Sequence, residues 1–342
     1  MTSILPDRPD VAQLRRQAKE LLRAAKGGDV AARERLAAIA DDPLNSTLTD
    51  AQTAIARESG FASWPKLRRA VAEVQDRSGG LRAVQPAYSS KTTGGAALFT
   101  ADTFVEQAQQ AGWKPGPLPD AIVFTFHAVY AKLLAEDARF EQNTRLAPSN
   151  SKMFTTVAGS PSIGVTCLSP GATAMVGQVE NQVALGGADR FVIVGTAGTI
   201  RSDVKPGDVV VVSSAVRDDG ISQHYLPPDT FVEADPALAN RLSTTLREQG
   251  VASTLGSTWT VPTPYRSTAE EVEQLAADGV ATVECEVASL LAVAEALGVR
   301  AGACLSVTSS LVGHPSEPSL RPVEPTAVLE AALSALGLPE AS

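Results

Sequence analysis

Short apolar runs alternate with helix-like segments along most of the chain, and this alternation constrains the fold more than any other feature. Five runs have the length and composition of buried strands: DAIVFTF (120–126), PSIGVTCL (161–168), RFVIVGTAG (190–198), GDVVVVSSAV (207–216) and ACLSVTSS (303–310). Helical patterns cover residues 171–187, 236–249, 268–276, 287–298 and 325–336. Continuously apolar strands that alternate with helices indicate an α/β domain with a mainly parallel sheet covered on both faces. Ligands of such domains bind where strand ends meet loops.

The chain is expected to contain two domains joined by a linker. Residues 1–76 predict a small all-α domain, because apolar residues recur there at helical spacing without strand-like runs. Residues 77–97 are rich in Gly, Ser and Thr, which is typical of a linker. Residues 98–342 then form the main domain.

Local signals mark four helices in the first domain. Asp29 follows Gly27-Gly28 and can cap a second helix. Thr49 and Gln52 have the spacing of a capping box for a third helix. Pro65 suits the first turn of a fourth helix.

The charge distribution excludes one class of partner. The net charge is −9, and it divides into +2 for residues 1–77 (13 Lys/Arg, 11 Asp/Glu) and −11 for residues 78–342 (16 and 27). An acidic main domain argues against general nucleic-acid binding, which needs a basic surface.

Other features indicate a cytoplasmic protein that is not embedded in a membrane. There is no run of about 18 apolar residues that could form a membrane span. The N-terminus lacks the apolar core of a signal peptide. The three cysteines, Cys167, Cys285 and Cys304, lie too far apart for a disulfide framework or a metal-binding motif. We therefore expect no metal site and a reducing compartment.

Two acids interrupt an apolar segment at VECEVASLLAVAEALG (283–298). In an extended segment, Glu284 and Glu286 would share one face. Buried acids need hydrogen-bond donors, and the vicinal hydroxyls of a sugar supply two. Negative charge there would also favour an oxocarbenium-like transition state at the sugar carbon. The alternative is a solvated strand end with two acids of no function.

Two glycine-containing loops are candidate anion sites. In LSPGATAM, Gly171 lies between a strand and a helix, whose free N–H groups can bind an anion. In VGTAGTI (194–200), Thr196 lies between glycines at a strand end, where its hydroxyl could hold a phosphate or a sugar hydroxyl. The alternatives are an ordinary strand-to-helix connection and a tight turn.

Two polar loops are candidates for contact with a heterocycle. In RDDGISQHYLPP (217–228), His224 is one of three histidines, and a structural or solvated role is the alternative. In TWTVPTPYRST (258–268), Tyr265 and Arg266 could stack on and bind a flat base, although a rigid proline-rich loop explains the segment equally well.

These stretches, in this order, resemble the nucleoside phosphorylase superfamily, and within it the uridine phosphorylase branch. The resemblance covers most of residues 120–335. It is carried by VGTAGTIRSDVKPGDVVVVSSAVRDDGISQHY and by PYRSTAEEVEQLAADGVATVECEVASLLAVAEALGVRAG. It implies a three-layer α/β sandwich around a mixed sheet, usually assembled into homo-oligomers. It also implies cleavage of the N-glycosidic bond of a nucleoside, with phosphate as co-substrate and no other cofactor. Residues 1–76 resemble the helical leader that precedes ankyrin repeats in some bacterial proteins.

The resemblance also implies residue roles. Glu286 and His224 would be catalytic. Glu284, Glu286, Cys285 and Thr196 would bind ribose, with Cys285 where the family usually has Met. Thr196, Lys152 and Gly171 would bind phosphate. Tyr265, Arg266 and Ser309 would line the base pocket.

The chain departs from the family pattern at the phosphate and base positions. Ile193 occupies the place of a phosphate-binding arginine, and FTFHAVYAK, which contains His127, replaces a Gly-Asp-Pro phosphate loop. Lys152 aligns with an arginine contributed by a neighbouring subunit. Ser309 stands where the purine branch has an acid, and Val261 where related chains have Asp.

Three functions are compatible with these residues. The base loop and the acid pair favour phosphorolysis of a nucleoside, with a pyrimidine base preferred. Loss of the arginines favours hydrolysis with water. A nucleoside-sensing module without turnover is the third possibility, because fold alone does not determine function.

Overall fold

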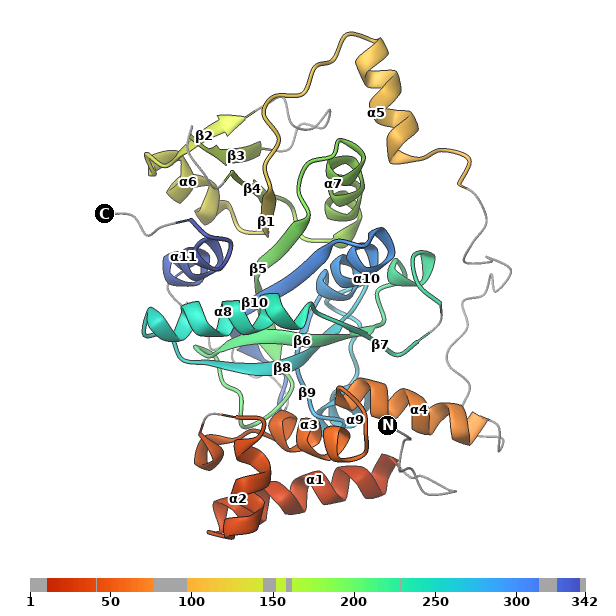
Figure 1. The fold of residues 1–342 in the computed structure, drawn as a ribbon, viewed down its shortest axis with the longest axis vertical. Helices are drawn as coiled ribbons and strands as arrows, with labels where there is room; N and C mark the ends of the chain where they lie inside the picture. The colour runs from red at the N-terminus through yellow and green to blue at the C-terminus, as the bar shows by residue number, and fades with distance from the viewer. Residues whose placement is uncertain are drawn as a thin grey trace. The chain divides into compact units, whose positions relative to one another are not determined.

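The computed structural model describes residues 11–40, 42–76, 97–143, 152–157, 162–227, 229–313 and 325–338, and the chain divides into two compact units (Figure 1). The first unit is built on residues 1–89 and the second on most of residues 90–342. Residues 77–96, where the sequence predicts a linker, lie outside the described residues.

The first unit is helical, as the sequence predicts. Its elements are α1 (Val11–Lys26), α2 (Val30–Ala37), the 3-10 helix η1 (Pro43–Asn45), α3 (Leu48–Glu58) and α4 (Trp64–Asp76). Asp29 caps α2 by accepting the N–H of Ala32 at 2.8 Å. The predicted capping box at Thr49 and Gln52 is wrong, because α3 begins at Leu48 and Thr47 is its N-cap. The box is formed by Thr47 and Asp50.

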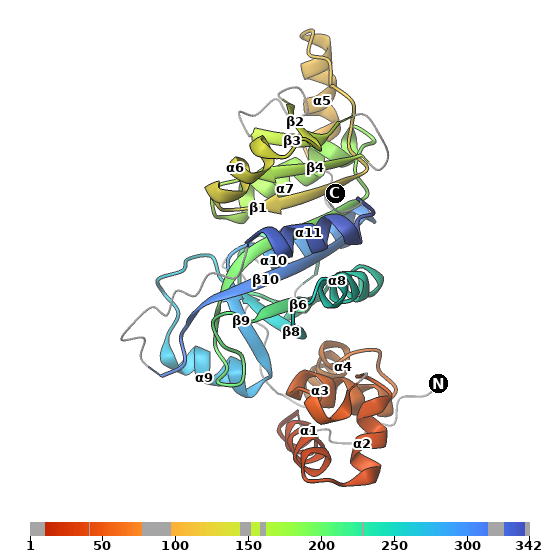
Figure 2. The same cartoon turned by 90° about the vertical axis from the view of Figure 1, so that its left-hand side faces the viewer.

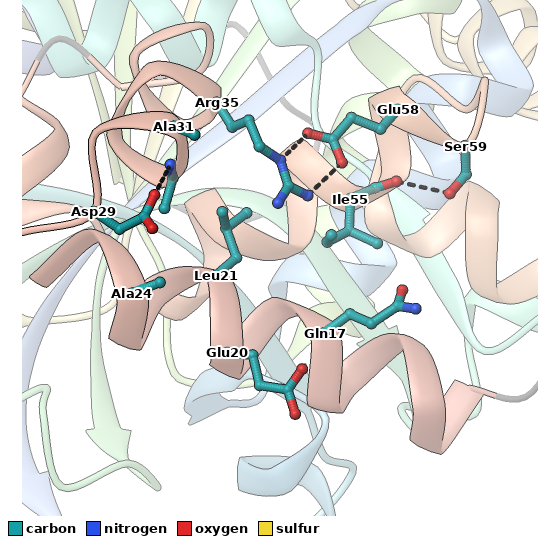
Figure 3. Close-up of a pocket in the computed structure, with 11 residues that line it drawn as sticks. Gln17, Glu20, Leu21, Ala24, Asp29, Ala31, Arg35, Ile55, Glu58 and Ser59 are labelled. Atoms are coloured by element: carbon teal, nitrogen blue, oxygen red, sulfur yellow. Dashed lines mark hydrogen bonds and ion pairs between the residues drawn. The ribbon is translucent and has the colours of Figure 1, made fainter. Parts of the chain in front are cut away.

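A hollow of about 610 Å³ lies among α1, α2 and α3 of this unit (Figure 3). The Arg35 guanidinium crosses it to form two hydrogen bonds with the Glu58 carboxylate, at 2.7 and 2.6 Å. The other lining side chains are mostly small, apolar or acidic, such as Ala24, Leu21 and Glu20. None of the lining residues is a histidine or a cysteine, and the guanidinium is already paired, so the hollow offers little for catalysis.

The remaining elements form a mixed α/β fold. The helices are α5 (Ala101–Gln110), α6 (Ala128–Glu136), α7 (Ala172–Ala184), η2 (Ser222–His224), α8 (Pro236–Glu248), α9 (Ala269–Ala277), α10 (Val287–Leu297) and α11 (Pro325–Ala335). The strands are β1 (Ala121–Thr125), β2 (Phe140–Asn143), β3 (Lys152–Thr156), β4 (Ile163–Cys167), β5 (Arg190–Thr199), β6 (Val209–Arg217), β7 (Phe231–Glu233), β8 (Ser253–Thr260), β9 (Val280–Glu284) and β10 (Arg300–Ser310).

These strands form one sheet that closes on itself in part. β5 pairs with both β9 and β10, so the path β5–β10–β6–β8–β9 returns to β5 as a ring. β1, β4, β3 and β2 extend from β5 in that order (Figure 2). The sheet is mixed, because β2–β3, β3–β4, β5–β9 and β6–β10 are antiparallel and the other pairs along this path are parallel.

Strand β5 shows why the apolar runs are continuous. Phe191 and Ile193 point into a core shared with α7 and α10. Val192 and Val194 point into a second core shared with α6, α8 and α11. Both faces of the strand are therefore buried under helices, which gives the three-layer arrangement. The segment 194–199 belongs to this strand and is not the tight turn that the sequence left open as an alternative.

Candidate functional site

Two strand ends converge on the middle of β5. β10 pairs with β5 along its length, so β1 and β9 share the other edge of that strand. β1 runs parallel to β5, and its last residue, Thr125, lies opposite Val194. β9 runs antiparallel, with Val283 opposite Gly198. The segments that follow β1 and β9 therefore meet beside residues 195–197, and carboxyl ends of strands are where α/β folds place ligand sites.

The segment after β1 brings His127 to Thr196. The imidazole Nε2 lies 3.2 Å from the Thr196 hydroxyl oxygen, at hydrogen-bond distance. His127 occupies the N-cap position of α6 in an extended conformation, but its side chain does not cap that helix. The imidazole is exposed, and Thr196 is partly buried. The sequence shows only that His127 directly follows a strand, since its partner is 69 residues away.

The segment after β9 carries Glu286, which is anchored to the start of α7. Its Oε1 accepts the main-chain N–H of Gly171 at 2.6 Å, and its Oε2 accepts the N–H of Cys285 at 3.2 Å. Burial raises the pKa of the Glu286 carboxyl, and the two amides oppose this rise. The N–H groups at a helix N-terminus favour a negative charge. The predicted anion site at Gly171 is thus occupied here by a carboxylate of the protein.

Glu284 has a different environment from Glu286. Its Oε2 accepts the N–H groups of Glu286 and Val287, at 2.6 and 2.8 Å. Its Oε1 accepts the hydroxyls of Thr260 at 2.5 Å and Thr258 at 3.4 Å. These four bonds match the number of lone-pair sites on a carboxylate. Glu284 therefore holds the start of α10, and its predicted contact with ribose stays a prediction.

The expectation that the two acids share one face rested on an extended backbone. β9 ends at Glu284, and Glu286 is already the N-cap of α10, with φ −135° and ψ −33°. The rule that alternate residues face the same way does not apply across this bend.

Burial, and next the Glu286 charge, raise the pKa of Glu284 to about 8.

Cys285 lies between the two acids and is half-buried. Burial, and next the charges of Glu286 and Glu284, raise the pKa of its thiol to about 12. A nucleophilic cysteine needs the opposite shift. The surroundings therefore suit a packing role for Cys285.

Ser309 and Ser306 lie on β10, next to the second half of β5. Ser309 is in register with Gly198, and its Oγ would lie 3.2 Å from a Cβ at that glycine, so a larger residue at 198 would crowd it. Ser306 is in register with Thr196 and buried, and its hydroxyl has no hydrogen-bond partner among the described residues. The sequence did not single out Ser306, because its position depends on strand register.

The remaining predicted residues lie farther from this cluster or at the surface. Lys152 begins β3, three strand steps from β5, or about 14 Å for the backbone. Tyr265 and Arg266 are exposed on the loop after β8, with Tyr265 at 93% exposure. His224 is exposed on η2, which packs against α10.

The loop that carries His224 is braced from within. Asp219 accepts the main-chain N–H groups of Ile221 and Ser222, at 2.5 and 2.7 Å, and so stabilises the bend at Gly220. The Arg217 guanidinium donates to Ser222 Oγ at 3.0 Å and to the carbonyls of Pro227 and Leu226. These hydrogen bonds of Arg217 therefore stabilise this loop.

Ile193 explains one departure from the expected phosphate site. Its side chain is fully buried in the core formed with α7 and α10. A guanidinium at this position would need a buried counter-charge or a polar ligand. Position 193 therefore contributes a buried apolar side chain to β5 where the resemblance predicts a cation.

Comparisons with known proteins match most of the second unit of the chain. The family model described as the Phosphorylase superfamily matches residues 122–336. A DeoD-type purine nucleoside phosphorylase of Bacillus cereus is 26% identical over 203 residues, which is 58% of this chain and 85% of that protein. A second one, from Caldanaerobacter subterraneus, is 25% identical over 59% of this chain and 87% of its own length. The uridine phosphorylase of Salmonella typhimurium is 31% identical over 34% of this chain and 51% of that protein.

The matched residues begin at the second residue of β1 and extend beyond α10, so they include His127, Thr196 and Glu286. The helices of the first unit lie outside them. Within the part of the chain that the structure describes, no helix is both long and apolar enough to cross a membrane.

Proposed function

The chain belongs to the phosphorylase superfamily, and on that premise we propose that it cleaves the N-glycosidic bond of a nucleoside with phosphate as the acceptor. One observation carries the proposal: the Glu286 carboxylate is anchored by Gly171 at the point where the ends of β1 and β9 meet beside Thr196. The purine and uridine phosphorylases among the relatives support the same reaction class.

Glu286 has the hydrogen-bonding capacity to bind ribose. Each carboxylate oxygen can accept about two hydrogen bonds, and each oxygen of Glu286 accepts one from the main chain. The remaining lone pair on each oxygen is available to one of two vicinal hydroxyls. Because the main chain holds the carboxylate in place, little reorganisation is needed when charge develops on the sugar.

The reaction conserves atoms and charge. A phosphate oxygen forms a bond to the anomeric carbon while the carbon–nitrogen bond breaks, and the electron pair of that bond stays with the base. The proton carried by monohydrogen phosphate ends on the base, so the products are the free base and a pentose 1-phosphate. We assign the base side to the loop with Tyr265 and Arg266, and the preference for a pyrimidine rests on that loop.

The test is product analysis with a panel of purine and pyrimidine nucleosides, with and without phosphate. Free base and pentose 1-phosphate that form only with phosphate support the proposal. Glu286→Gln should lower kcat/KM by at least 100-fold, because the neutral amide loses both charge and acceptor capacity. Glu295→Gln, an exposed change on the same helix, is the matched control and should leave kcat/KM unchanged. Full activity of Glu286→Gln would show that the site is wrong.

Hydrolysis is the second candidate, and the buried Ile193 favours it. Without a guanidinium at this position, a phosphate dianion loses a bidentate charged partner. Free base with free pentose, at a rate independent of phosphate, would establish water as the acceptor. Binding of nucleosides without any cleavage would instead indicate a sensing role.

We also propose that the chain acts as a homo-oligomer, as the resemblance implies. Lys152 would then contribute to the phosphate site of a neighbouring subunit. This role is supported by the position of Lys152 three strands away from β5 in its own subunit. Light scattering coupled to gel filtration tests the assembly. A monomer that is fully active would contradict this role.

A further inference from the structure

We propose that His127 is an acceptor-binding residue that donates a hydrogen bond from Nε2 to the phosphate, side by side with the Thr196 hydroxyl. This inference rests on the function proposed above. It assigns to an imidazole, on the loop after β1, part of the role that the resemblance gives to guanidinium groups.

The position of His127 follows from the strand order. β1 and β5 are neighbours, and the chain leaves β1 at Thr125, opposite Val194. Two residues later, the imidazole reaches across to Thr196, which lies two residues beyond Val194 on β5. The contact is thus built on the two central strands of this part of the sheet, which are buried on both faces.

The pair has the geometry of a two-donor site. The imidazole Nε2 and the Thr196 hydroxyl oxygen lie 3.2 Å apart. Because hydrogen bonds to oxygen span about 2.7–3.2 Å, both donors can reach the same phosphate group. The imidazole is exposed and does not cap α6, so it can exchange its bond to Thr196 for a bond to a ligand.

The charge of the surrounding groups points to His127 as well. In the described part of the chain, His127 is the basic side chain that contacts Thr196. Ile193 is apolar. An imidazole can supply both a donor and, when protonated, a positive charge.

The first residues of α6 add to this environment. His127 is the N-cap of this nine-residue helix, so the free N–H groups of the first turn lie beside it. A helix N-terminus favours an anion by a modest amount. Acting together, the imidazole, the Thr196 hydroxyl and this terminus offer phosphate a site that needs no guanidinium.

The test measures the KM for phosphate at saturating nucleoside, and the KM for nucleoside at saturating phosphate. His127→Ala should raise the KM for phosphate at least tenfold while the KM for nucleoside changes less than twofold. His127→Gln places an amide N–H near the position of Nε2 and should restore most of the affinity for phosphate. Lys132→Ala removes a nearby exposed cation from α6 and is the matched control, which should leave both constants unchanged.

A second measurement does not depend on turnover. Phosphate should raise the Tm of the wild type and of His127→Gln, with a much smaller shift for His127→Ala. The inference is overturned if His127→Ala binds phosphate like the wild type, or if both KM values rise equally. If the wild type cleaves nucleosides without phosphate, the proposed function itself fails, and this outcome is visible before any variant is made.

Discussion

The main-chain N–H of Gly171 donates to Oε1 of Glu286 across 2.6 Å, and this bond joins two segments that are 115 residues apart. Gly171 is the N-cap of α7, with φ 118° and ψ 140°. That conformation is open to glycine and strained for other residues. The position of the candidate ribose-binding carboxylate therefore depends on a glycine at the start of another helix.

Gly171→Ala should impair the site through the backbone. No atom lies within 4 Å of the added Cβ, so the cost comes from the dihedral angles and not from a clash. Relief of that strain would turn the N–H away from Glu286. We expect a loss of about 1–3 kcal/mol in stability and a fall in kcat/KM of tenfold or more, measured by steady-state kinetics.

Gly186→Ala is the matched control for this change. Gly186 also has a positive φ, 70°, with open space around it, but it follows the other end of α7. The Gly186→Ala variant should have a lower Tm than the wild type and an unchanged kcat/KM. If both variants lose kcat/KM to the same degree, the hydrogen bond between Gly171 and Glu286 is not needed for activity.

Glu284 should matter for stability more than for chemistry. Glu284→Ala would leave two buried N–H groups and the Thr260 hydroxyl without their acceptor. The loss should be about 2–4 kcal/mol, measured by urea denaturation. Glu284→Gln keeps one acceptor oxygen and should cost less than half as much. Equal stability of the wild type and Glu284→Ala would contradict the assigned role.

The sequence predicts the five strands β1, β4, β5, β6 and β10 because both faces of these strands are apolar, but it does not predict β2, β3, β7 or β8. RFVIVGTAG lies in β5 as expected, and β6 begins at the third residue of GDVVVVSSAV. The ring formed by β5, β10, β6, β8 and β9 could not be predicted in this way, because hydrophobic patterns do not specify which strands pair. The mixed sheet was implied only by the family resemblance.

The candidate site could be predicted only in part for the same reason. The spacing of Glu284 and Glu286 predicted two acids on one face, but the backbone bends between them. One acid became a helix-stabilising group, and the other faces the strand ends. The contact between His127 and Thr196 needs the register of β1 against β5, which no local pattern contains.

The stability of the protein should fall as the pH rises from about 4.5 to about 8. Burial raises the pKa of Glu284 from 4.5 to about 8 in the folded state, so the folded protein binds more protons than the unfolded chain between these values. The stabilising contribution is complete below the unfolded pKa and is lost as the pH rises through the folded pKa. A single group of this kind changes the free energy of unfolding by up to about 1.4 kcal/mol per pH unit.

Glu284→Gln isolates this effect from the general repulsion of an acidic protein. The Tm of the wild type and of the variant should be compared at steps between pH 5 and pH 8. The wild type should lose its advantage over Glu284→Gln as the pH rises. Parallel curves would mean that Glu284 titrates alike in the folded and unfolded states.

Cys285 should resist alkylation, although it lies in the candidate site. Burial and two neighbouring acids raise the pKa of its thiol to about 12, and burial does the same for Cys304. Since the thiolate is the reactive form, iodoacetamide at pH 7.5 should label both residues far more slowly than it labels them in urea, as followed by peptide mass spectrometry. Glu286→Gln removes the acid whose charge raises the pKa of the Cys285 thiol more than that of Glu284 does, and should speed the labelling of Cys285 without affecting Cys304. Rapid labelling of Cys285 in the folded wild type would reopen a role for this thiol as a nucleophile.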